Sequence, residues 1–125
     1  MKLKKILLLI SCLLVVSLMA CSPSESKEEN YHATIILSLD NNSEVIEELD
    51  VSFEPPMKLL TLLENNTEII EEDGLITSIN GHEQNIEENK FWLYEINGEM
   101  AMVGTNEYEV KDNDVIHFDL GEMQE

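Results

Sequence analysis

Hydrophobic and polar positions alternate most regularly in the last third of the chain, over residues 91–120. Large side chains recur at every second position up to Asn97-Gly98, a dipeptide that favours a tight hairpin turn. After a short hydrophobic run at residues 100–103 and an acidic turn at residues 112–114, the alternation returns in a closing strand. The alternating positions are Trp92, Tyr94 and Ile96 in the first strand and Ile116, Phe118 and Leu120 in the last. This pattern predicts a β-meander with one buried face.

Two further strands are predicted earlier in the chain, over residues 33–39 and 44–53. The polar turn 40–43 separates them, and two strands across a short polar loop form an antiparallel hairpin. In the second strand, acidic residues alternate with hydrophobic ones. The hydrophobic residues of one parity, which we expect to face the core, are Val45, Leu49, Val51 and Phe53.

Between the hairpin and the meander, the hydrophobic period changes to that of a helix. Pro55-Pro56 stops the second strand, and Pro56 suits the first helical position because its missing N–H costs nothing there. A hydrophobic stripe then predicts a helix over residues 57–65, which is too short to persist without packing against a sheet. Residues 75–79 are predicted as a third strand and residues 82–90 as a polar loop, while the assignment of Ile69-Ile70 stays open.

The order strand, strand, helix, strand, loop and meander predicts an α+β, β-grasp-like fold. This fold has one mixed sheet with one short helix packed on one face, and its first and last strands pair in parallel at the centre. Ile36, beside Ile35 and Leu37, fits such a central strand because a central strand accepts hydrophobic side chains on both faces.

The start of the chain has the layout of a secretory signal, with three lysines followed by a hydrophobic run too short for a comfortable transmembrane helix. The run ends in Leu18-Met19-Ala20-Cys21, which resembles the processing site of bacterial lipoproteins. That resemblance implies cleavage before Cys21 and acylation of Cys21 with lipid chains such as palmitate. We therefore expect a lipoprotein signal peptide at residues 1–20, the lipidated cysteine and a flexible acidic tether at 21–30, the domain at 31–121 and a tail at 122–125. An ordinary signal peptide with a chance cysteine is the alternative.

The charge of the chain excludes one class of partner. All 26 acidic residues lie after position 20, where only four lysines and no arginine remain, so the net charge there is −22. A surface this acidic repels phosphate backbones, which excludes nucleic acid as a partner. The charge keeps an extracytoplasmic domain soluble; attraction of cations or of a basic partner is the alternative. If Cys12 is removed and Cys21 acylated, no thiol is left for a disulfide or a zinc site.

From Gly74 onward the residues resemble a specific family. The matching features are Gly74, Ser78-Ile79-Asn80-Gly81, Trp92 and Tyr94, Asn97-Gly98, Gly104, Tyr108, the acidic turn 112–114, and Ile116 with Phe118. They resemble a bacterial domain of unknown function related to the C-terminal domain of the cobalamin carriers transcobalamin and intrinsic factor. The resemblance implies a β-grasp-like module, which in the carriers covers one face of a corrinoid held by a separate helical domain.

Four residues of this pattern are candidate ligand-binding residues: Trp92, Tyr94, Asn97 and Tyr108. Aromatic rings form a platform on which a flat ligand stacks, although the same rings also close the core of a small sheet. No metal site is predicted, because His32, His82 and His117 are scattered without ligand spacing. The turns 40–44 and 112–114 offer oxygen ligands for calcium, but turn chemistry explains both without an ion.

No motif for catalysis is present, so neither an enzymatic activity nor a cofactor is predicted. We expect a monomeric binding domain, anchored to the lipid bilayer through acylated Cys21 on the extracytoplasmic face of a cell membrane. Its ligand would be a small flat metabolite such as a corrinoid. The alternative is a surface protein-interaction module without a small-molecule ligand.

Overall fold

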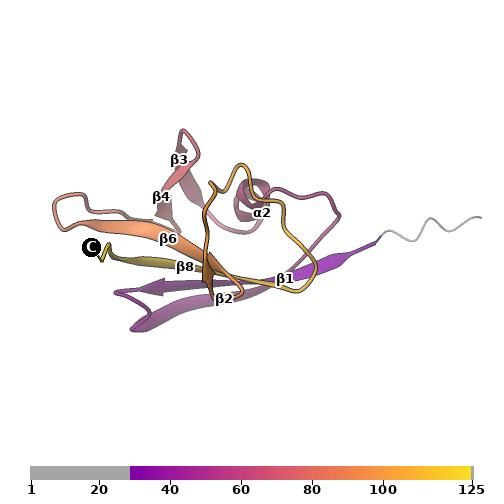
Figure 1. Cartoon of the computed structure of the whole chain (residues 1–125), viewed down its shortest axis with the longest axis horizontal. Coiled ribbons are helices and arrows are strands. Elements are labelled where there is room, and N and C mark those ends of the chain that lie inside the picture. Colours follow the sequence, from indigo (N-terminus) through magenta and orange to yellow (C-terminus); the bar gives the residue numbers. More distant parts are fainter. Residues whose placement is uncertain (1–28, 125) are drawn as a thin grey trace, which may run out of the picture.

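The structure of the chain, a computed structural model, describes residues 29–124. One helix and eight strands follow one another along this part of the chain (Figure 1). They are β1 Tyr31–Leu39, β2 Glu44–Phe53, α2 Leu59–Asn66, β3 Ile69–Glu72, β4 Leu75–Ile79, β5 His82–Glu83, β6 Lys90–Ile96, β7 Glu99–Met100 and β8 Asp114–Glu122. The expected signal peptide, Cys21 and most of the expected tether lie outside the described residues.

The large sheet has the strand order β2-β1-β8-β6-β7. β1 pairs antiparallel with β2 on one side and parallel with β8 on the other, with Ile35 opposite Ile116. The predicted parallel pairing of the first and last strands is thus confirmed, and with it the mixed sheet. β1 has hydrophobic side chains on both faces, because Ile35 is fully buried while Ile36, on the other face, is half-buried.

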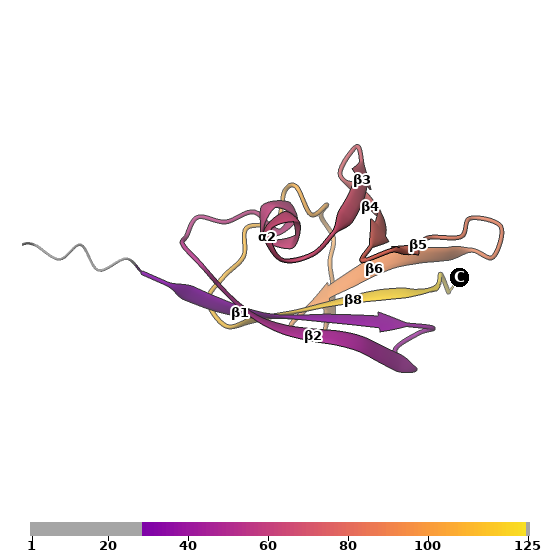
Figure 2. The same cartoon turned by 180° about the vertical axis from the view of Figure 1, so that it is seen from behind.

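A second layer covers one face of the large sheet, as Figures 1 and 2 show from opposite sides. It contains α2, a small sheet of order β3-β4-β5, and the long connection between β7 and β8. The predicted third strand therefore joins a separate hairpin rather than the large sheet. Asp73 and Gly74 both have positive φ and form a tight turn, so the strand pairs with Ile69–Glu72, the segment whose assignment was open. We call the opposite face of the large sheet, turned away from α2, the outer face.

The helix begins two residues later than the sequence predicts. Met57 and Lys58 are not helical, because their backbone pairs with the connection before β8. The Val110 N–H donates to the Met57 carbonyl at 2.8 Å. The first N–H groups of α2 also find tertiary acceptors. Leu59 donates to the Tyr108 carbonyl and Leu60 to the Thr105 carbonyl, both at 2.9 Å. The helix start is therefore stabilised by the connection rather than by a side-chain cap.

The predicted burial of Val45 is wrong. The pairing of β1 with β2 shifts by one residue between Leu37 and Ser38, where Ile46 is the extra residue of β2. Such a bulge moves the side chains on one side of it to the opposite face of the sheet, here those of the residues before Ile46. Val45 therefore lies opposite Ser38 and is 58% exposed, whereas Val51 and Phe53, which follow the bulge in β2, are buried as predicted.

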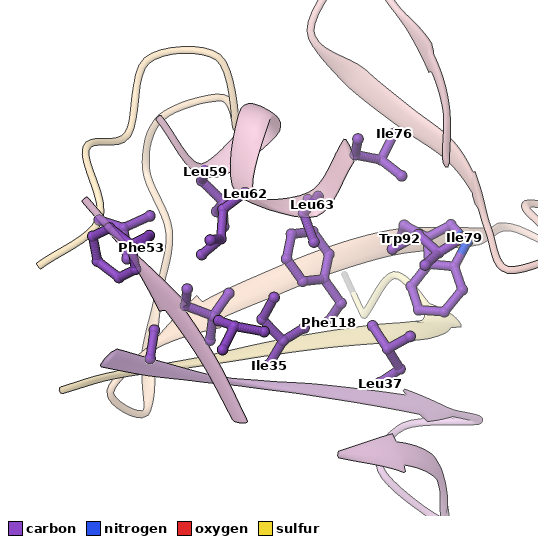
Figure 3. Packing of buried hydrophobic residues seen from close by; sticks show 14 of the residues in the cluster. Ile35, Leu37, Phe53, Leu59, Leu62, Leu63, Ile76, Ile79, Trp92 and Phe118 are labelled. Atoms are coloured by element: carbon purple, nitrogen blue, oxygen red, sulfur yellow. The ribbon is translucent and has the colours of Figure 1, made fainter. Parts of the chain in front are cut away.

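The hydrophobic core lies between the large sheet and the second layer (Figure 3). Leu59, Leu62 and Leu63 of α2 are at most 1% exposed and point toward the sheet. Ile79 of the small sheet and Trp92 of β6 belong to the same buried cluster (Figure 3). The large sheet also contributes Ile35, Leu37, Phe53 and Phe118. Ile76, like Ile79, comes from β4 of the small sheet.

Candidate functional site

A short hydrophobic segment, residues 100–103, is exposed where the chain leaves the large sheet after β7 and rises toward α2 (Figure 1). Met102 is 91% exposed, Met100 55% and Val103 44%. Only Met100 belongs to a strand, so the predicted hydrophobic run of the meander is largely an irregular loop. We call residues 100–103 the apolar segment.

Two shallow hollows flank the apolar segment and share it as a wall. One, of about 290 Å³, is also lined by Leu75, Trp92 and Tyr94. The other, of about 350 Å³, is also lined by Asn97 and Tyr108. All four candidate ligand-binding residues therefore surround one segment, two on each side, although 16 positions separate the first from the last in the sequence. Leu75 extends the hydrophobic surface, since it is 71% exposed.

Tyr94 holds the apolar segment in place. Its hydroxyl donates to the Val103 carbonyl at 2.5 Å, and its carbonyl accepts the Ala101 N–H at 3.1 Å. Its ring stacks on Phe118 with centroids 5.0 Å apart. Trp92 is 7% exposed, and its indole N–H donates to the His82 carbonyl at 2.8 Å. The indole is thus part of the core beneath the first hollow, and ligand contact by these rings stays a prediction.

Asn97 and Tyr108 converge on Asp114, a carboxylate that is only 3% exposed. The Tyr108 hydroxyl donates to Asp114 Oδ2 at 2.7 Å, and the Asn97 side-chain amide donates to Oδ1 at 3.0 Å. The backbone N–H of Lys111 donates to Oδ2 at 2.8 Å. No cation within the described residues forms an ion pair with this carboxylate, so hydrogen bonds alone satisfy it.

Burial raises the pKa of Tyr108 well above its usual value, and the hydrogen bond to Asp114 raises it further. Burial also raises the pKa of Tyr94, with a smaller effect from Glu107. Both tyrosines therefore remain neutral hydrogen-bond donors at physiological pH. The polar groups of Asn97 and Tyr108 are used inside the fold, and what the site offers to a ligand is mainly the hydrophobic surface of the apolar segment.

A third hollow, a groove of about 620 Å³, lies on the outer face. At one end, Ser38 is fully buried and donates from its hydroxyl to Asp119 Oδ1 at 2.6 Å. His117 Nε2 lies 2.7 Å from the same Ser38 oxygen. Since the single hydroxyl proton points to Asp119, His117 donates to Ser38 from Nε2. Asp119 also accepts the N–H groups of Asn41 and Asn42, at 3.1 and 2.9 Å.

Sequence reasoning missed this cluster, because it judged His117 by its spacing from the other histidines and did not set it beside Ser38 and Asp119. The signal was the predicted parallel pairing, which sets Ser38 opposite Asp119 and Ile36 opposite His117 once the register is known. A serine, a histidine and an aspartate also form the catalytic site of many hydrolases. Ser38, however, has no exposed surface and cannot contact a substrate. The cluster instead pins the turn of Asp40, Asn41 and Asn42, all of which have positive φ, to the large sheet.

The described residues contain no group of three or more His, Cys, Asp or Glu side chains that could hold a metal ion. The two candidate calcium turns use acidic side chains for other contacts: Asp40 pairs with Lys90 at 3.0 Å, and Asp112 accepts the His32 N–H at 2.9 Å. Nor does the described part of the chain include a helix long and hydrophobic enough to cross a membrane.

Similarity to known proteins agrees with this fold. A crystal structure of a candidate metal-binding protein from Ruminococcus gnavus ATCC 29149 superimposes with a TM-score of 0.58 at 19% identity, covering 75% of this chain and 99% of that chain. A crystal structure of haptocorrin in complex with Cbi superimposes with a TM-score of 0.59 at 16% identity, covering 75% of this chain but only 26% of haptocorrin. At these identities the likeness shows the fold. No curated protein sequence matches this chain.

The sequence profile of the family described as "Domain of unknown function (DUF4430)" matches residues 57–122, more than half of the chain. The matched part begins just before α2 and ends with β8, so it contains the small sheet, the apolar segment and the hydrogen bonds around Asp114. Together with the likeness to haptocorrin, this agrees with the predicted resemblance to the C-terminal domain of the transcobalamin group. The chain belongs to the DUF4430 family, and its fold is like that of the C-terminal domain of the transcobalamin group.

Proposed function

We propose that this chain is a binding domain, not an enzyme, and that it holds a small, largely hydrophobic molecule against the apolar segment. The observation that carries the proposal is the exposure of Met100, Met102 and Val103 between two hollows, on a chain that is otherwise strongly acidic. Exposed hydrophobic side chains that lie together, with hollows beside them, are typical of ligand-binding surfaces.

The chemistry of the apolar segment suits a flat ligand. Methionine side chains are flexible and polarisable, so Met100 and Met102 can adapt to a ring system laid across them. A corrinoid is the most specific candidate, because haptocorrin is described in complex with Cbi. This chain corresponds to only 26% of haptocorrin, so a corrinoid held here would be covered on one side and would need a second surface on the other.

The proposal includes a location. Acylated Cys21 would anchor the domain to the extracytoplasmic face of a membrane, with the acidic tether between them. Anchored in this way, a monomeric domain would capture ligand near the membrane surface. Mass spectrometry of the membrane-extracted protein tests the anchor: a diacylglyceryl group on Cys21 is expected, and an unmodified cysteine in the exported chain would contradict it.

The binding experiment uses the single tryptophan, Trp92, which lies beneath the first hollow. Titration of the full chain in non-ionic detergent micelles with cobinamide and cobalamin is expected to quench the tryptophan emission to saturation. Met102→Asp places a charge where the ligand would remove a hydrophobic side chain from water. We expect it to weaken binding by about tenfold or more, since burying such a side chain contributes about 1.5–3 kcal/mol.

Ile86→Asp is the matched control. Ile86 is as exposed as Leu75, at 71%, but lies in the connection between β5 and β6 and lines neither hollow. Ile86→Asp adds the same charge and should leave the affinity unchanged. Absence of any response to either corrinoid would remove the corrinoid version. Equal effects of the two variants would remove the apolar segment as the site.

A surface protein-interaction module is the second candidate, and β2 is the observation that favours it. β2 is a ten-residue strand at the edge of the large sheet, so the backbone groups along its outer side are open to a further strand. Its acidic side chains oppose non-specific pairing, as charged edge strands commonly do. A pull-down interaction with a partner that persists in moderate salt and is lost in the Val45→Pro variant would favour this candidate over small-molecule capture.

A further inference from the structure

The groove on the outer face combines a hydrophobic floor with carboxylates. Leu93, Met100 and Met123 line it together with Glu95, Asp119 and Glu122. Its volume, about 620 Å³, lies within the range of small-molecule sites. We propose that this groove binds a small organic cation, an amine or ammonium compound with a hydrophobic body. The groove shares Met100 and Ala101 with the apolar segment but is not lined by Met102 or Val103, so the Met102→Asp and Glu95→Gln variants distinguish the two proposals.

The pairing of the strands sets these groups side by side. Glu95 lies opposite His117 on β8 and opposite Met100 on β7, so the three side chains form one row across the outer face. In the next row, Leu93 lies opposite Asp119. Neighbouring strands are about 4.8 Å apart, so a ligand the size of one aromatic ring contacts the Glu95 carboxylate and the hydrophobic floor at once.

Among residues 29–124 no carboxylate of the groove forms a salt bridge; Lys90 lies opposite Glu122 on β8 and attracts it only at longer range, whereas Glu95 and Asp119 have no lysine beside them. Both ion pairs in this part of the chain use Lys90, whose ammonium lies 3.0 Å from Asp40 and 3.8 Å from Glu88. Glu95 is half-buried, yet its side chain has no hydrogen bond or ion pair among the described residues. Asp119 is satisfied by neutral donors only, the Ser38 hydroxyl and two backbone N–H groups. The negative potential of the groove is therefore available to a ligand.

Charge complementarity decides the ligand class. An anion would meet three carboxylates and a chain with a net charge of −22 after residue 20. A bare metal ion would find no group of three suitable ligands among the described residues. A purely hydrophobic molecule would leave Glu95 shielded from water without a partner, which is costly. An organic cation satisfies both features, because its charge pairs with Glu95 and its body covers Leu93 and Met100.

The test uses three water-soluble probes with the same ring: benzylammonium, benzyl alcohol and benzoate. Each is titrated into the uniformly ¹⁵N-labelled full chain in non-ionic detergent micelles at neutral pH, and amide shifts report both affinity and location. Benzylammonium is expected to shift the amides of Leu93, Glu95 and His117 and to bind about fivefold more tightly than benzyl alcohol. Benzoate is expected to cause no shifts there.

Glu95→Gln and Glu64→Gln form the matched pair of variants, because each removes one negative charge. Glu64 is exposed on α2, in the layer on the other side of the sheet. We expect Glu95→Gln to weaken benzylammonium binding about threefold to fivefold, as for a partly exposed ion pair, and Glu64→Gln to leave it unchanged. Equal effects of the two variants, or equal affinities for benzylammonium and benzyl alcohol, would overturn the proposal. So would groove shifts caused by a lysine-rich peptide but not by benzylammonium, which would indicate a protein partner instead.

Discussion

Asp114 is the position at which a single conservative substitution should cost the most stability for its size. The carboxylate is 3% exposed and accepts hydrogen bonds from Tyr108, Asn97 and the Lys111 backbone at 2.7, 3.0 and 2.8 Å. Asp114→Asn keeps the shape but replaces one acceptor oxygen by an NH₂ group. If the remaining oxygen keeps the Tyr108 and Lys111 bonds, the new NH₂ group faces the side-chain NH₂ of Asn97. Asn97 cannot turn its amide around, because its oxygen accepts the Val115 N–H at 2.8 Å.

The size of the effect follows from these bonds. A hydrogen bond to a charged group contributes about 1.5–3 kcal/mol, and a bond between neutral groups about 0.5–1.5 kcal/mol. Asp114→Asn loses one charged bond outright and weakens two, while it removes the cost of burying a charge. We expect a net loss of about 2–4 kcal/mol, which is a large part of the 5–15 kcal/mol by which such domains are stable.

Urea unfolding followed by the emission of Trp92 measures this loss, since the single tryptophan is buried in the folded state. Glu109→Gln is the control, because Glu109 is exposed and lies in the same connection, and its replacement should change stability by less than about 0.5 kcal/mol. If Asp114→Asn were no more destabilising than Glu109→Gln, the reasoning that these three bonds stabilise the connection would be refuted.

Two further substitutions test other contacts. The pKa of Tyr108 is raised above its usual 10.0 by burial first and then by the bond to Asp114, so the folded state keeps this proton at a pH where the unfolded chain loses it. The stability that this group contributes is therefore fully present below about pH 10 and falls above it. Tyr108→Phe should make the alkaline decline of the unfolding free energy shallower when unfolding is measured as a function of pH. An unchanged slope of unfolding free energy against pH would contradict the assignment. A methyl group on Gly121 would collide with the side chains of Asn41 and Asp119, so Gly121→Ala should displace the turn at Asp40. We expect a loss of about 1–3 kcal/mol by thermal or urea unfolding, and wild-type stability would show that the turn moves aside at little cost.

Sequence patterns were sufficient where local alternation and turn chemistry act alone. β2 and β4 begin and end at the predicted residues, because strong turn residues bound both of them. Asn97-Gly98 forms the predicted turn, with both residues at positive φ. The parallel pairing of β1 with β8 was also predictable, because the order of the predicted elements indicates a β-grasp arrangement and Ile36 fits a central strand with hydrophobic side chains on both faces.

The candidate site was predictable only in part. The four candidate residues do surround one segment, but the exposure of Met102 does not follow from a hydrophobic run, which by itself predicts burial. The roles of Asn97 and Tyr108 as donors to Asp114 depend on three loops that meet only in the fold. The groove with Glu95 depends on strand register, which no single segment contains.

The sequence by itself thus determined β1, β2, β4, β6 and β8, the parallel pairing of β1 with β8, and the acidic character of the molecule, because these depend on neighbouring residues, on the order of the elements and on composition. The tertiary structure decided the separate small sheet, the late start of α2, the bulge that exposes Val45, and the buried position of Asp114. Each of these arises from backbone groups finding partners far away in the chain, as when Leu59 donates to the Tyr108 carbonyl. Such long-range pairings compete with local preferences, and their outcome depends on how all the segments pack together.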